Sequence, residues 1–140
     1  MDIMRNVSHS ISGKTAVGIE RGLFVGVADR NVVCGAGEKA AGVTQDAAMA
    51  GEQFAIDVAG VAMVTLAATI VAGKPVGSDA SGKAVEVADV AVAVPVDSTP
   101  VTSDAAQPDL LVSGGALPVQ VNGWLLAGGD AGDLRPVLLV

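Results

Sequence analysis

Large aromatic side chains are nearly absent from this chain of 140 residues, which contains one Trp, two Phe and no Tyr. Hydrophobic residues nevertheless make up 51% of the sequence, and most of them are Ala and Val. Such a proportion excludes a chain that is disordered throughout, because disordered segments are poor in apolar residues. Since Ala and Val bury less area than Leu or Phe, we expect a thin core and a monomer that gains stability on association.

Basic residues are scarce as well. Eight Lys and Arg, dispersed along the chain, stand against fifteen Asp and Glu and leave a net charge of −7. A nucleic-acid binder needs a basic patch to neutralise phosphates, so we expect no direct contact with DNA or RNA. The single cysteine, Cys34, excludes an intrachain disulfide, which is typical of a protein made in a reducing cytosol such as that of a host cell.

Neither a membrane span nor a signal peptide is indicated. The longest apolar stretch, Val58 to Ala72, is shorter than the roughly 20 residues that cross a bilayer. The N-terminus lacks a basic region followed by an apolar one. We therefore expect no membrane partner.

Residues suited to catalysis or metal binding are few. His9 is the only histidine and lies in a polar terminal stretch, a poor frame for a Ser-His-Asp arrangement. Cys34 ends an apolar run, which favours a small buried side chain, and a zinc site needs about four Cys or His ligands. Asp57 is the one carboxylate inside a strong strand pattern, and alternation predicts that it faces solvent. The sequence thus predicts no enzyme, cofactor or metal site.

Glycine and proline, by contrast, are frequent, with 18 and 6 residues scattered without a period of three. This spacing excludes a collagen-like repeat and is typical of many short strands joined by tight turns. Four Ala-Gly-charged triplets begin at Ala36, Ala50, Ala72 and Ala131. Because Gly supplies the positive φ of a tight turn, we interpret all four as turns. Their irregular spacing argues against a solenoid repeat.

Alternating apolar residues predict the strands. Residues 23–27 and 54–58 alternate in this way, and Arg21-Gly22 predicts a hairpin turn before the first of them. Residues 58–72 are ambiguous between a β-branched strand and a strand followed by a short helix. The valines beyond residue 85 change parity at Ala88-Asp89, which predicts a β-bulge or a tight bend there.

Two segments lack a core pattern. Residues 1–15 are polar, and we interpret them as an extended arm or a loose first strand. Residues 97–110 predict a long polar loop bracketed by Pro100 and Pro108, either a functional loop or a disordered surface excursion. The remainder, residues 16–140, is expected to form one all-β barrel or sandwich-like domain.

Three segments carry a family resemblance. Residues 39–62 contain Gly-Val-Thr, an acidic Ala-rich turn and Ala-Gly-Glu, followed by two strands separated by a Gly. Residues 70–84 predict an Ala-Gly hairpin that ends in Gly-Lys-Ala, and residues 131–140 predict a closing strand after Ala-Gly-Asp. Together they resemble the small capsid decoration proteins, or cement proteins, of tailed bacteriophages. The likeness extends over residues 23–96 and 122–140.

The resemblance implies a small β-rich protein on the outer surface of the virion head, across junctions between major capsid subunits. It implies the major capsid protein and further copies of the chain as partners, with a homotrimer favoured over a dimer. Such a protein stabilises the lattice by mass action through several contacts per oligomer. Residues 1–15 and 97–121 depart from the simplest family pattern, so the neighbours that this chain grips stay open.

Capsid or subunit contacts are expected in the segments without a core pattern. Trp124 is first of all an ordinary core filler, although Trp is also enriched at interface hot spots. Two other functions stay open: another virion component, such as a fibre base, tail protein or adhesion module, and, less favoured, a small trimeric enzyme. The candidate contact residues are Ile3, Arg5, Val7, His9, Ile11, Pro100, Val101, Pro108, Leu110 and Trp124.

Overall fold

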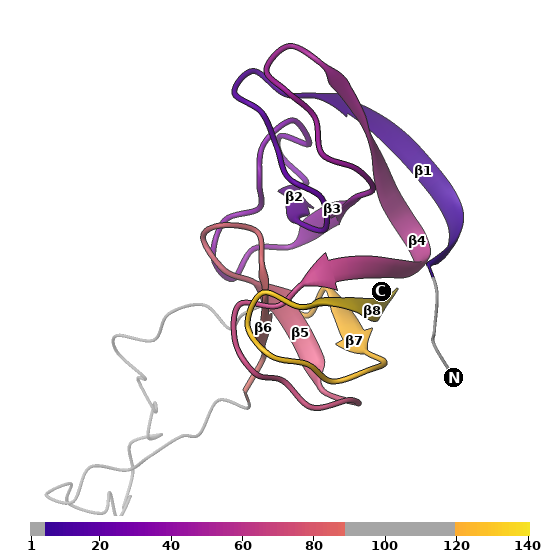
Figure 1. The fold of residues 1–140 in the computed structure, drawn as a ribbon, viewed down its shortest axis with the longest axis vertical. Helices are drawn as coiled ribbons and strands as arrows, with labels where there is room; N and C mark the ends of the chain where they lie inside the picture. The colour runs from indigo at the N-terminus through magenta and orange to yellow at the C-terminus, as the bar shows by residue number, and fades with distance from the viewer. Residues whose placement is uncertain (1–4, 89–119) are drawn as a thin grey trace, which may run out of the picture. The chain divides into compact units, whose positions relative to one another are not determined.

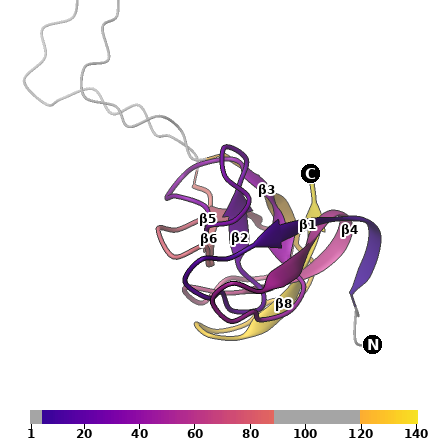
Figure 2. The same cartoon turned by 90° about the horizontal axis from the view of Figure 1, so that it is seen from above.

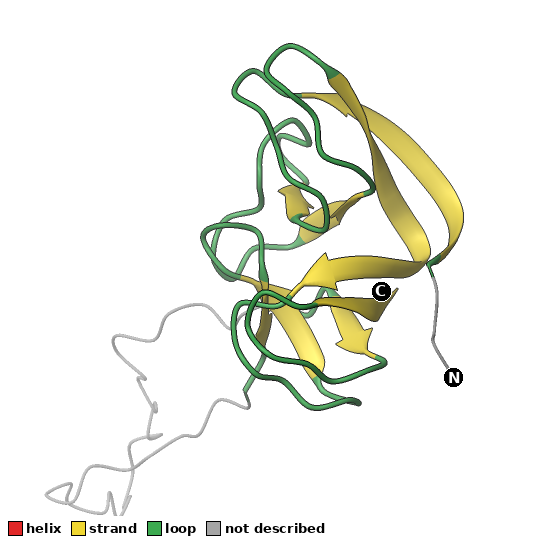
Figure 3. Ribbon diagram, viewed as in Figure 1, coloured by secondary structure: helices red, strands yellow, loops and turns green. Residues whose placement is uncertain are grey.

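The computed structural model describes residues 5–88 and 120–140, which form strands and turns without a helix (Figures 1 and 3). The all-β fold class predicted from the sequence is confirmed. No helix of the described residues is long and apolar enough to cross a membrane. The strands are β1 (Asn6–Lys14), β2 (Phe24–Gly26), β3 (Ala40–Thr44), β4 (Gln53–Thr65), β5 (Pro75–Ser78), β6 (Ala84–Glu86), β7 (Gly123–Leu125) and β8 (Leu134–Leu139).

Several sequence predictions lie outside the described residues. They include the 97–110 loop, the contact residue Ile3 and the register change at Ala88-Asp89, since Asp89 is not described. The other candidate contact residues outside the described ranges are Pro100, Val101, Pro108 and Leu110.

A single antiparallel sheet nearly closes into a barrel, seen from above in Figure 2. Neighbouring strands follow the order β2-β3-β4-β8-β7-β5-β6, and β1 pairs with β4 off this path. The two ends of the path meet, because the N–H of Phe24 in β2 donates to the carbonyl of Gly82 beside β6 at 2.7 Å. A bridge between Leu66 and Ala84 adds a second link. Closure of this kind hides strand edges that would otherwise be open to pairing.

The longest strand, β4, changes partners along its length. Residues 53–61 pair with β1, whereas residues 61–65 pair with β8. Gly60 lies at this change with a φ of 93°, and Figure 1 shows β4 bending sharply on its way from β1 to β8. Of the two alternatives for residues 58–72, the structure shows a strand through Thr65 followed by turns, and no helix.

The N-terminal segment forms a strand along its own barrel. Most side chains of β1 are exposed, so the absence of an apolar period in its sequence follows from a strand held chiefly by backbone pairing with β4. Its outer edge is partly capped: Arg30 Nε donates to the Ser12 carbonyl at 2.7 Å, and the Lys14 N–H donates to Asn31 Oδ1 at 2.8 Å. Side chains on an exposed edge are a common obstacle to unwanted strand addition.

The core consists of two groups of buried side chains, in which small aliphatic residues are prominent. The larger group is Phe24, Cys34, Val43, Ala62, Val64, Leu66, Ile70, Val76, Ala84, Leu125 and Val137. The smaller group is Ile19, Leu23, Val25, Phe54 and Ile56.

The Ala-Gly-charged triplets are turns, as predicted. Their glycines, Gly37, Gly51, Gly73 and Gly132, have φ values of 74°, 85°, 86° and 88°. The turn predicted at Arg21-Gly22 is also present, with a φ of 75° at Gly22. It does not close a hairpin, however, because Ile19 before it pairs with Ala48 rather than with β2.

Candidate interaction surfaces

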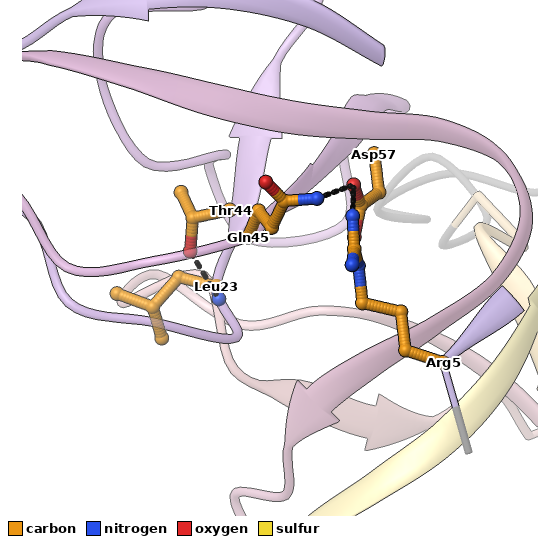
Figure 4. A network of polar contacts seen from close by, with 5 residues as sticks. All are labelled: Arg5, Leu23, Thr44, Gln45 and Asp57. Atoms are coloured by element: carbon orange, nitrogen blue, oxygen red, sulfur yellow. Dashed lines mark hydrogen bonds and ion pairs between the residues drawn. The ribbon is translucent and has the colours of Figure 1, made fainter. Parts of the chain in front are cut away.

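A buried carboxylate in β4 is held by the N-terminal segment. Asp57 is 1% exposed, and Arg5 donates to it twice, from Nε to Oδ2 at 2.8 Å and from Nη2 to Oδ1 at 3.2 Å (Figure 4). Gln45 Nε2 donates to Oδ1 at 3.3 Å. Turned over, the Gln45 amide would present its oxygen to the Arg5 guanidinium, so this amide has a partner in either orientation.

The prediction that Asp57 faces solvent is wrong. Alternation does place its side chain opposite that of Ile56, but Arg5 and Gln45 cover that side of the strand. A carboxylate is buried at tolerable cost only when a charged partner and hydrogen bonds compensate it. Because Arg5 lies 52 residues away in the sequence, local alternation gives no sign of this compensation.

Other buried polar side chains join loops to strands. Thr44 Oγ1 accepts from the Leu23 N–H at 3.0 Å, as Figure 4 shows, and donates to the Glu20 carbonyl at 2.7 Å. Asn122 Oδ1 accepts from the Ala40 N–H at 2.9 Å, which joins the start of β7 to β3. Their hydrogen bonds are spent on the fold, so these groups are structural.

Cys34 is fully buried, as the sequence predicted. Burial raises the pKa of its thiol, the Ser78 hydroxyl partly offsets that rise, and the charge of Glu38 adds to it. A raised pKa lowers the fraction of reactive thiolate. Within residues 5–88 and 120–140, no three His, Cys, Asp or Glu side chains are placed to hold a metal ion.

The main exposed apolar feature is a row of side chains across four strands. Register pairs join Val61 in β4 to Leu138 in β8, Leu138 to Trp124 in β7, and Trp124 to Pro75 in β5. Directly paired residues share a face of the sheet, so these four side chains adjoin. Trp124 is 44% exposed and Leu138 43% exposed. We call these four residues the Trp124 row.

The prediction of Trp124 as a core filler is wrong. Its neighbours Gly123 and Leu125 are the buried residues of β7, which leaves Trp124 on the opposite face. Gly123 is itself required on the inner face, because a Cβ there would overlap Val137 Cγ1. The inner side is therefore already filled, and the largest side chain of the protein faces outward.

The structure separates the remaining candidate contact residues. His9 and Ile11 are exposed on β1, with Ile11 at 42%, and Val7 is half-buried there. Arg5 is engaged with Asp57 and keeps 35% of its side chain exposed. Sequence reasoning missed Leu138, because it lies in an uninterrupted apolar run at the C-terminus, where alternation gives no signal.

Taken together, the closed all-β body, the structural use of its buried polar groups and the Trp124 row define a small β-barrel with an exposed apolar face. The family model described as phage cement protein matches residues 5–121. This chain belongs to the phage cement protein family, whose members are structural proteins associated with the phage capsid.

A solved structure has a similar fold. The N base of the head fiber gp8.5 of bacteriophage phi29 matches with a TM-score of 0.62 and 12% identity, over 94% of this chain and 93% of that chain. At this identity the likeness concerns the fold alone. No curated protein matches the chain.

Proposed function

We propose that this protein binds the outer surface of the phage head and stabilises the lattice of the major capsid protein. Membership of the phage cement protein family, matched over residues 5–121, is the observation that carries the proposal. A protein that binds the assembled lattice stabilises it by mass action. The chain is made in the host cytoplasm and joins the virion on its outer face.

The contacts with the shell are proposed on two exposed surfaces. One is the Trp124 row, since Trp is strongly enriched among residues that dominate binding energy. The other is β1, where His9 and Ile11 are exposed and the chain continues toward Ile3. We further propose that the protein acts as a homo-oligomer, a trimer rather than a dimer, so that each particle holds the lattice at several points.

Purified protein mixed with expanded capsids that lack it is expected to co-sediment saturably and to raise the melting temperature of the capsid. Saturation gives the copy number per capsid, and light scattering of the free protein gives its oligomeric state. The proposal fails if the folded protein neither sediments with the capsids nor changes their melting temperature.

Trp124→Ala is expected to weaken capsid binding by about 30-fold, the effect of losing a hot spot worth about 2 kcal/mol. The stability of the variant should stay within about 0.5 kcal/mol of the parent, because Trp124 lies outside the core. Leu125→Ala is the matched control: its neighbouring side chain is 1% exposed, so it should lose about 2–4 kcal/mol of stability instead. Unchanged binding by Trp124→Ala would remove the Trp124 row from the contact surface.

A second candidate function is the base of a head fibre. The fold shared with the phi29 head fiber base, at a TM-score of 0.62, favours it specifically. Such a base binds the head and also seats a further fibre segment. Electron microscopy of capsids decorated in infected cells separates the two functions, since a cement protein shows compact knobs and a fibre base shows projecting fibres.

A further inference from the structure

Four turns of the barrel occupy the same hydrogen-bonded setting. Each has a glycine with positive φ, and the N–H of that glycine donates to the carbonyl of a residue that itself precedes another of the four turns. The pairs are Gly22 to Thr44, Gly51 to Thr15, Gly73 to Leu125 and Gly132 to Leu66, at 3.0, 2.7, 2.7 and 2.8 Å. The turns therefore interlock two by two.

The acceptor residues complete the pattern by donating back. Their N–H groups bond the residue just after the partner glycine: Thr15 to Glu52, Thr44 to Leu23, Leu66 to Asp133 and Leu125 to Lys74, at 3.1, 2.9, 2.9 and 2.9 Å. Between the interlocked turns lie two reciprocal bridges, Ile19 with Ala48 and Ile70 with Gly129. A shift of 51 residues takes the turn at Gly22 to that at Gly73, and a shift of 81 takes Gly51 to Gly132.

The strand register follows the same two shifts. Phe24 pairs with Val43 as Pro75 pairs with Trp124. The pair Ile11 and Ile56 corresponds to Ala62 and Val137, and the pair Ser10 and Asp57 corresponds to Val61 and Leu138. Thus β1 and β2 correspond to the second half of β4 and to β5, while β3 and the first half of β4 correspond to β7 and β8.

The sequence supports the correspondence. Between residues 15 and 26, five positions recur unchanged at the shift of 51: Ala16, Ile19, Gly22, Val25 and Gly26 match Ala67, Ile70, Gly73, Val76 and Gly77. They include the turn glycine and two buried side chains of the core. Recurrence of the same residues in the same hydrogen-bonded places is difficult to attribute to shared turn chemistry alone.

We propose that the chain contains two copies of one structural unit, residues 6–58 and 57–139, and that residues 89–119 are an insertion in the second copy that the barrel does not need. The two shifts differ by 30 residues, and the difference falls between Ala88 and Gln120. The corresponding place in the first copy is Gly37 to Lys39, part of a tight turn in which the Glu38 N–H donates to the Gly35 carbonyl at 3.3 Å.

The barrel offers a short path across the insertion. The Val87 N–H donates to Pro75 and the Asn122 N–H donates to Val76, so both ends of the segment flank β5. Strands on either side of one strand lie about 10 Å apart. A linker of four residues spans up to about 13 Å, and one of eight spans about twice that.

Replacement of residues 89–119 by Gly-Ser-Gly-Ser tests the proposal, with an eight-residue Gly-Ser linker as a second variant. The shortened protein is expected to unfold cooperatively, with a melting temperature within about 4 °C of the parent and unchanged fluorescence of Trp124. Failure of both linkers to give a cooperative transition would overturn the proposal, because the segment would then belong to the folding unit.

Gly73→Val in the full-length chain is the matched control. This glycine has a φ of 86° and occupies one of the four equivalent turns, so the variant should melt well below both the parent and the shortened protein. A silent Gly73→Val would contradict the role of the repeated turn in the fold.

Discussion

Gly60→Ala is expected to destabilise the protein by about 3 kcal/mol. Gly60 has a φ of 93°, which side chains rarely adopt, and it lies where β4 passes from β1 to β8. A Cβ at this position would overlap the Asn6 carbonyl oxygen and lie 3.1 Å from the Ser8 nitrogen. These are backbone atoms of β1, so relief requires β1 to move away and lose its pairing with β4.

Gly51→Ala separates the two causes. Gly51 has a similar φ of 85°, but nothing lies within 4 Å of an added Cβ. Its cost should therefore be the backbone strain alone, about 1–2 kcal/mol. Urea denaturation gives both free energies, and hydrogen exchange shows whether β1 loses protection in Gly60→Ala. Equal losses in the two variants would mean that close packing against β1 contributes nothing.

Arg5→Met is expected to cost about 2 kcal/mol of stability. The substitution leaves the buried Asp57 carboxylate with the Gln45 amide as its remaining polar side-chain partner among the described residues. Loss of one member of a fully buried ion pair costs about 3–5 kcal/mol. Water that reaches the 35% of the Arg5 side chain that is exposed reduces this figure.

A double-mutant cycle with Asp57→Asn tests whether the loss belongs to the pair. A neutral amide needs no charged partner, so Arg5→Met should cost less in the Asp57→Asn background, with a coupling of about 1 kcal/mol or more. Arg30→Met is the matched control, since Arg30 also binds β1 but at an exposed carbonyl, and its loss should stay near 0.5 kcal/mol. A cycle without coupling, or equal losses for the two arginines, would contradict the role assigned to Arg5.

Local patterns in the sequence predicted the parts of the fold that depend on local chemistry. The four Ala-Gly-charged turns follow from the conformational freedom of Gly, and the first part of β4 follows from the alternation of Phe54, Ile56 and Val58. The family followed from the order of such turns and strands. Each of these features is contained within a few neighbouring residues.

The interaction surfaces could not be predicted in this way. Alternation states that Trp124 and Leu125 point in opposite directions, but which direction is the core depends on Val137, which fills the inner side of β7. The burial of Asp57 likewise depends on an arginine from the far end of another strand. Both outcomes are set by pairing between distant segments.

The correspondence between the two halves was hidden by unequal spacing. The Ala-Gly-charged triplets include only three of the four repeated turns and add an unrelated one at Gly37, so their intervals show no period. Comparison of the chain with itself at a shift of 51 residues would have revealed the first half of the pattern. The second half requires a different shift, because the additional residues interrupt it.

A consequence of the shared strand concerns how the molecule responds to force. One end of β4 pairs with β1 and the other with β8, so a single unbroken backbone runs through both halves of the barrel. Tension on one half is carried to the other by covalent bonds and not by side-chain contacts alone. Neither half can be peeled open without disturbing the strand that anchors its neighbour, so we expect the barrel to yield in one step when pulled.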